Sequence, residues 1–151
     1  INFRYIGLIY SAFPKAKIIH IKRNSAATCW GNYKQLFSNK KSFHYCYDLD
    51  SIITYYALYK DLMQFWEKNC GNRIYTLSYE MLTINQEVET RKLIKHLDLE
   101  WEETCLAPQN NKRSVGTASS RQIRQKVYQG SSEKWKKFEP FLNGVFNHLK
   151  D

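Results

Sequence analysis

The sequence has no apolar stretch long enough to cross a membrane. Every hydrophobic run ends well short of the roughly 18 residues that a spanning helix needs. The opening stretch, INFRYIGLIYSAF, also lacks the basic leader and small-residue cleavage site of a signal peptide, and its apolar spacing fits an amphipathic helix better. We therefore expect a soluble, cytoplasmic chain with no membrane partner.

The sequence is equally poor in clustered metal ligands. Its four cysteines (Cys29, Cys46, Cys70 and Cys105) are far apart, no CxxC pair occurs, and the four histidines are scattered. Zinc sites and disulfide frameworks need closer and more regular spacing. We expect reduced, structural thiols and no metal cofactor.

Charge is unevenly distributed along the chain. The net charge is +9, yet residues 51–100 carry 6 basic and 7 acidic side chains. Residues 112–137 carry 8 basic side chains against Glu133 alone. Such a run is either a solvated face or the binding surface for a phosphate, a sulfate or a nucleic acid.

What is present is an alternation of strand and helix patterns in a chain of single-domain length. Residues 16–22 and 73–78 are predicted strands, and helices are predicted over 3–13, 26–37, 49–70, 87–99, 119–130 and 133–150, the last interrupted at Pro140. In the long helix, a stripe at helical spacing predicts a core face: Ile52, Tyr55, Tyr59, Leu62 and Trp66. The pattern indicates an α/β fold, helix-rich with few parallel strands.

Arg23 lies where the first predicted strand ends and a helix begins, with Asn24 or Ser25 as its N-cap. Open α/β sheets bind ligands at this edge, and the free N–H groups of a helix start favour an anion. A guanidinium adds a planar fork that can hold two phosphate oxygens. The local pattern therefore predicts a phosphate-type anion site, with a simple pairing of Arg23 to a carboxylate as the alternative.

Four segments in order carry a more specific pattern. They are PKAKIIHIKRNSAATCWGNYKQLFS, RIYTLSYEML, TASSRQIRQKVY and SSEKWKKFEPFL. Together they resemble sulfotransferases that use 3′-phosphoadenosine 5′-phosphosulfate (PAPS), especially bacterial ones linked to tetratricopeptide repeats and, more distantly, tyrosylprotein sulfotransferases. The resemblance covers essentially the whole chain and implies a P-loop-NTPase-like sulfotransferase fold.

The resemblance implies a 3′-phosphate site made by Arg23 and Lys134, which match the family's phosphate-binding arginine and lysine. The family serine that shares this phosphate corresponds to Gly31, so one hydroxyl donor is missing here. The backbone N–H of Gly31 remains, and the phosphate can approach more closely.

Three further positions are implied to lie at the cofactor. Tyr79 matches a tyrosine that lies against the adenosine, although a strand-end aromatic residue is the alternative. Ser119 matches a serine near the sulfate, although it could equally be an N-cap. Arg124 matches the arginine of a family RQ pair that proline commonly follows, and Lys126 takes the place of that proline.

The family's phosphosulfate loop, of the type PKSGTT, has no match in the sequence. We therefore interpret residues 1–151 as the C-terminal part of a sulfotransferase domain, with the loop and the general base upstream of Ile1. Catalytic residues stay unknown, and we expect the chain alone to be inactive. The acceptor is expected to bear a hydroxyl, and its identity cannot be predicted.

Two other functions stay open. The loss of the serine at position 31 is compatible with a non-catalytic nucleotide-binding protein. The charge and the eleven tyrosines are compatible with a basic nucleic-acid-binding module, but the tyrosines gather in helix stripes and not within the basic run. We expect no nucleic-acid partner, and we expect self-association through exposed sheet edges.

Overall fold

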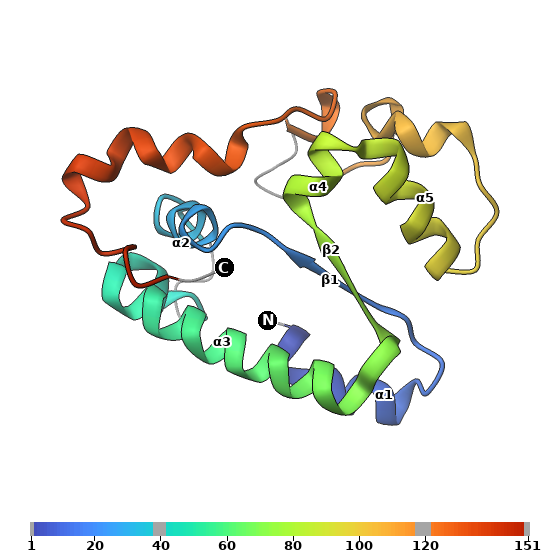
Figure 1. Ribbon diagram of the computed structural model, residues 1–151, viewed down its shortest axis with the longest axis horizontal. Helices are drawn as coiled ribbons and strands as arrows, with labels where there is room; N and C mark the ends of the chain where they lie inside the picture. Colours follow the sequence, from blue (N-terminus) through green and yellow to red (C-terminus); the bar gives the residue numbers. More distant parts are fainter. Residues whose placement is uncertain (1, 38–41, 117–121, 150–151) are drawn as a thin grey trace.

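The computed structural model of the chain describes residues 2–37, 42–116 and 122–149. Two parallel strands lie at its centre, β1 (Ile18–Lys22) and β2 (Ile74–Ser78) (Figure 1). They pair in register from Ile18 opposite Ile74 to Lys22 opposite Ser78. Both strand predictions are confirmed, and the carboxyl ends of the two strands meet at one edge of the sheet.

Helices surround this small sheet. The α-helices are α1 (Ile6–Ala12), α2 (Ser25–Tyr33), α3 (Leu49–Cys70), α4 (Tyr79–Ile84) and α5 (Gln86–His96). The 3-10 helices are Asn2–Tyr5, His44–Tyr47, Gly71–Arg73, Glu103–Leu106, Pro108–Asn110, Gln122–Arg124 and Ser131–Phe141. The described chain is thus α/β and helix-rich, with a two-stranded parallel sheet.

Side-chain caps set the starts of the helices next to the sheet. The Asn24 side chain accepts a hydrogen bond from the Ala27 N–H at 2.9 Å, and the Asp48 carboxylate accepts one from the Ser51 N–H at 2.8 Å. These bonds satisfy N–H groups that have no partner within the first helical turn. At the other end of α3, Gly71 has a φ of 53°, a left-handed conformation that glycine adopts without strain.

Two apolar clusters hold the helices together. In the first, Cys29 of α2 and Ile52 of α3 pack with Phe146, so the end of the chain closes over both helices. In the second, Ile6 of α1 packs against Met63 of α3 and Ile74 of β2. In Figure 1, α3 runs along the lower side of the sheet and takes part in both clusters.

Some local predictions differ from the structure. Helix α2 ends at Tyr33 and not at residue 37, because Lys34 ends the helical ladder as its C-cap. Helix α4 was not predicted; it begins directly after β2, where the Ser78 hydroxyl accepts a hydrogen bond from the Met81 N–H. The helix predicted over 133–150 is shorter in the structure: Ser131–Phe141 form a 3-10 helix that contains Pro140, and turns follow over residues 142–148.

Helix α3 is the longest helix among the described residues, and polar residues recur along it. Within the described part of the chain, no helix combines the length and the apolar character that a bilayer crossing requires.

Candidate anion-binding site

Arg23 and Tyr79 each follow the last residue of a strand, so both lie at the carboxyl edge of the sheet. The Arg23 guanidinium lies over the Tyr79 ring, 4.9 Å from the ring centroid. This edge is where open α/β sheets bind ligands. The parallel pairing of the two strands thus brings two predicted site residues, 56 positions apart, into contact.

Arg23 is fixed by the 3-10 helix Ser131–Phe141. Its Nη2 donates to the Ser131 carbonyl oxygen at 2.9 Å, and its Nε donates to the Ser132 hydroxyl at 3.1 Å. The Ser131 hydroxyl is also hydrogen-bonded to the Tyr79 hydroxyl, at 2.7 Å. The C-terminal segment therefore joins the ends of both strands, and the guanidinium is held in one orientation.

The carboxylate of Glu80 helps to hold Ser132, a hydrogen-bond partner of Arg23, in place. Glu80 Oε1 accepts hydrogen bonds from the Ser132 hydroxyl at 2.6 Å and from the Asn24 N–H at 3.0 Å. Burial opposes ionisation of Glu80, but these two hydrogen bonds and the nearby Arg23 charge outweigh it and lower the pKa of Glu80. A negative Glu80 holds Ser132, and through it Arg23, in place.

A polar hollow opens beside Arg23, between α2 and the C-terminal segment. It has a volume of about 240 Å³. We call it the cationic cavity, and its lining is Arg23, Ala27, Trp30, Gly31, Lys34, Gln35, Tyr79, Gln122, Tyr128, Ser131, Lys134 and Trp135. Three of these side chains are cationic, and no carboxylate is among the described residues of the lining. The local charge favours an anionic ligand.

The cationic cavity brings together four of the six positions that the sequence predicted for the cofactor. Arg23, Gly31, Tyr79 and Lys134 all line it, from three separate segments of the chain. Arg124 is outside this lining, and its guanidinium donates to the carbonyl oxygen of Arg113.

The other predicted positions are placed differently. Ser119 lies outside the described residues, so its predicted place near the sulfate stays a prediction. Lys126, which stands where the family commonly has proline, lies in the described link between the 3-10 helices Gln122–Arg124 and Ser131–Phe141.

Five polar residues of this cavity were not predicted from the sequence: Lys34, Gln35, Gln122, Tyr128 and Ser131. Lys34 follows Gly31 by three positions, which places both on one side of a helix, and this spacing could have identified it. Tyr128 lies beneath a site residue, with its ring centroid 4.7 Å from Lys134 Nζ. No sequence spacing relates Gln122 and Tyr128 to the other lining residues, because only the tertiary fold of the chain brings them to the cavity.

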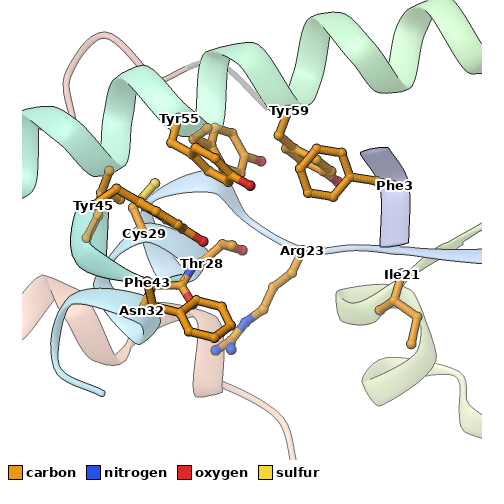
Figure 2. Close-up of a pocket in the computed structure, with 12 residues that line it drawn as sticks. Phe3, Ile21, Arg23, Thr28, Cys29, Asn32, Phe43, Tyr45, Tyr55 and Tyr59 are labelled. Carbon is orange, nitrogen blue, oxygen red and sulfur yellow. The ribbon is translucent and has the colours of Figure 1, made fainter. Parts of the chain in front are cut away.

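A second hollow, of about 260 Å³, shares Arg23 with the first (Figure 2). We call it the aromatic cavity. Its lining is Phe3, Ile21, Arg23, Thr28, Cys29, Asn32, Phe43, Tyr45, Ile52, Tyr55, Tyr56 and Tyr59. The tyrosines of the predicted core stripe in α3, Tyr55 and Tyr59, therefore face a hollow and are only partly buried.

Burial raises the pKa of several thiol and phenol groups that line the aromatic cavity. Burial raises the pKa of Cys29 to about 12, so its thiol is protonated. Burial, followed by the charge of Glu67, raises the pKa of Tyr59. The Tyr59 hydroxyl is hydrogen-bonded to His20 Nε2, and burial lowers the pKa of this histidine despite Glu67, 3.5 Å from Nδ1.

Within the described ranges, no group of three or more histidine, cysteine, aspartate or glutamate side chains is arranged to hold a metal ion. The cationic groups that line the cationic cavity are one guanidinium and two ammonium groups.

These features define a class: an α/β chain with a cationic hollow at the carboxyl edge of a parallel sheet. A family model described as the Sulfotransferase family matches residues 1–103, and the chain belongs to this family. It is also 37% identical, over 151 residues, to an uncharacterized protein of Aquifex aeolicus (strain VF5). That match covers 99% of this chain and 20% of the relative, so the chain spans about a fifth of the relative's length.

Proposed function

We propose that this chain supplies the 3′-phosphate side of a PAPS site in a sulfotransferase that acts on a hydroxyl-bearing acceptor. One observation carries the proposal. Four positions that resemble the family's cofactor-binding residues, on separate segments, line a single cavity with three cations and no carboxylate in its described lining. Family membership supports the reaction class, because sulfotransferases in general use PAPS.

The residues of the cavity fit the nucleotide. Its 3′-phosphate would be held by Arg23, whose fork suits two phosphate oxygens, and by Lys134 as a point charge. The hydrogen bonds of Arg23 to Ser131 and Ser132 orient the guanidinium before any ligand arrives. Such preorganisation lowers the entropy that binding would otherwise cost.

Lys34 compensates for the hydroxyl that Gly31 lacks. It is the C-cap of α2, three residues after Gly31, and lines the same cavity. In its place the site gains a positive charge, which attracts phosphate more strongly than a neutral donor does. The absence of the family serine is therefore compatible with tight binding of the nucleotide.

When bound, PAPS supplies an activated sulfuryl group for transfer to the acceptor oxygen, leaving adenosine 3′,5′-bisphosphate. As in phosphoryl transfer, catalysis depends mainly on positioning and on stabilising charge. In this proposal the chain's own residues position the nucleotide from its 3′ side. The sheet then belongs to a P-loop-NTPase-like sulfotransferase fold.

The test is a calorimetric titration of the chain with adenosine 3′,5′-bisphosphate and, separately, with 5′-AMP, which lacks the 3′-phosphate. We expect the bisphosphate to bind more tightly. Replacing Lys134 by glutamine should weaken the bisphosphate about ten-fold or more, the effect of one charge-assisted hydrogen bond, and leave AMP unchanged. Arg23→Gln should have at least as large an effect.

Lys137→Gln is the matched control, because Lys137 lies on the same 3-10 helix as Lys134, is exposed, and is not among the cavity's lining residues. It removes the same charge without touching the site. Since Arg23 also joins two segments of the fold, circular dichroism must show that Arg23→Gln is folded. Equal binding of bisphosphate and AMP, or equal effects of the two lysine variants, would contradict the proposal.

A further inference from the structure

The aromatic cavity has no role in the proposed 3′-phosphate site, although the two share a wall at Arg23. Half of its twelve lining residues are aromatic, contributed by the 3-10 helices Asn2–Tyr5 and His44–Tyr47, by α3, and by the link before His44. Figure 2 shows Tyr45 and Tyr55 on one side and Phe43 on another, with Thr28 between them.

Contacts among the rings make these walls firm. Tyr45 stacks on Tyr55 with centroids 3.9 Å apart and an angle of 16° between the planes, and Phe43 stacks on Phe37 at 4.4 Å and 17°. The Phe3 ring meets Tyr59 edge-on at 5.1 Å. Each ring that faces the hollow is therefore held by another ring behind or beside it, and the hollow is preformed.

The chemistry of the lining selects among ligands. Rings that present faces and edges favour a further aromatic ring, through stacked or edge-on contacts. An aromatic cage can also hold an organic cation. Here, however, Arg23 lines the cavity and no carboxylate is among its described lining residues, so a cation is repelled.

A few polar groups lie among the rings, as in most small-molecule sites. Thr28 and Asn32, one helical turn apart on α2, line the cavity with Arg23. The Thr28 hydroxyl donates to the Asn24 carbonyl oxygen at 3.0 Å, which leaves its oxygen able to accept a hydrogen bond from a ligand. The four tyrosines of the lining carry hydroxyls as well, so an aromatic ring with a hydroxyl would meet both ring faces and hydrogen-bonding groups here.

We propose that the aromatic cavity binds a phenol, with its ring between Phe43 and the Tyr45–Tyr55 pair and its hydroxyl toward Thr28, Asn32 and Arg23. The role of this phenol as sulfuryl acceptor rests on the proposed function; its binding does not. The volume of about 260 Å³ accommodates a molecule of one or two fused rings.

The experiment is a fluorescence titration of the chain with 2-naphthol. Decahydro-2-naphthol is the matched ligand, because it has the same skeleton and hydroxyl without aromaticity, and phenyltrimethylammonium tests the cation alternative. We expect 2-naphthol to bind and the other two, measured by displacement, to compete at least about three-fold less well. No binding of 2-naphthol to the folded chain, or equal competition by either other ligand, would overturn the proposal.

A pair of variants locates the ligand. Phe43→Leu removes a ring from the cavity but keeps apolar bulk, and should weaken 2-naphthol about two- to ten-fold. Phe65→Leu makes the same change on α3 at a residue that is 52% exposed and outside the cavity lining, and should have no effect. Equal effects of the two variants would overturn the assignment. If Phe43→Leu does not fold, Tyr55→Leu replaces it.

Titration of the same samples with adenosine 3′,5′-bisphosphate separates the two proposals. Phe43→Leu should bind the bisphosphate as the wild type does, because Phe43 is outside the lining of the cationic cavity. Binding of 2-naphthol without the bisphosphate would sink the proposed function and leave a phenol site. Binding of the bisphosphate without 2-naphthol would sink only the phenol site.

Discussion

The two cavities that meet at Arg23 are nearly equal in size, about 240 and 260 Å³, but opposite in chemistry. The cationic cavity is lined by two lysines, amides and hydroxyls, many of them on exposed residues. Five of the six rings that line the aromatic cavity belong to or pack against the two apolar clusters. Size therefore does not decide what each could bind; the lining does.

Arg23 lies at the boundary between the two cavities. Its side chain separates the polar, positively charged cationic cavity from the aromatic cavity, and long cationic side chains are suited to such boundaries because an apolar chain carries a charged end. Its hydrogen bonds to Ser131 and Ser132 fix this division. A residue of the cationic cavity should thus affect ligand affinity, and a residue of the aromatic cavity should also affect stability.

The largest effect should be a loss of stability, at a residue that lines the aromatic cavity and also belongs to the apolar core. Ile52 is 2% exposed, belongs to the apolar cluster of α2 and α3, and lines the aromatic cavity. Ile52→Ala should lower the free energy of unfolding by about 2–5 kcal/mol, since it deletes buried methylene and methyl groups. Urea denaturation measures this loss.

Leu58→Ala is the control, because Leu58 lies on the same helix and is 62% exposed. It should change stability by no more than about 0.5 kcal/mol. Similar losses for both variants would mean that the aromatic cavity is not continuous with the core, and the contrast between the two cavities would fail.

A smaller effect, a gain in ligand affinity, is expected from a substitution in the cationic cavity. A Cβ placed on Gly31 meets no atom within 4 Å, so a side chain fits there without displacement. Gly31→Ser should restore the hydroxyl of the family pattern and tighten binding of adenosine 3′,5′-bisphosphate about two- to ten-fold, the worth of one net hydrogen bond. Calorimetry measures the change.

Gly31→Ala distinguishes the contribution of the serine hydroxyl from that of a more rigid helix backbone. Both substitutions replace a glycine inside α2, so both should stabilise the helix, alanine by about 0.5–1 kcal/mol. Alanine should not tighten the bisphosphate. An equal gain in affinity for serine and alanine would show that rigidity, and not the hydroxyl, is responsible.

The smallest effect concerns pH. The pKa of Glu80 is lower in the folded chain than its ordinary value of 4.5. The ionised carboxylate therefore stabilises the fold above pH 4.5, and this contribution is lost as the pH falls through the folded-state pKa. Glu80→Gln should lose less stability on acidification than the wild type, measured by denaturant midpoints above and below pH 4.5. Identical acid profiles would refute a supporting role for Glu80 behind Arg23.

Much of the local structure could be predicted because its signals are local. The β-branched run before Arg23 is readable from neighbouring residues and is confirmed as a strand, and of the two predicted N-cap candidates, Asn24 and Ser25, the cap is Asn24. Helix α4 was missed because its signal is short: six residues directly after a strand. The end of α2 was misplaced because apolar spacing continues to Phe37 after the helix has stopped.

The two cavities were predicted unequally. Arg23 was predicted from its place between a strand and a helix, and Tyr79 and Lys134 from the resemblance to a family; all three line one cavity. The aromatic cavity was not predicted: the spacing of Tyr55 and Tyr59 indicates a core face equally well, whether the face is packed or borders a hollow.

The sequence by itself determined the strand that ends just before Arg23, the helix that Asn24 caps, the excess of positive charge and the family. Only the tertiary structure decided that Ser131 and Ser132 hold Arg23 between two hollows, and that Lys34 and Tyr128 join one of them. The physical reason is range. Helix and strand signals act over a few residues, whereas these contacts join residues more than a hundred positions apart through the packing of the C-terminal segment.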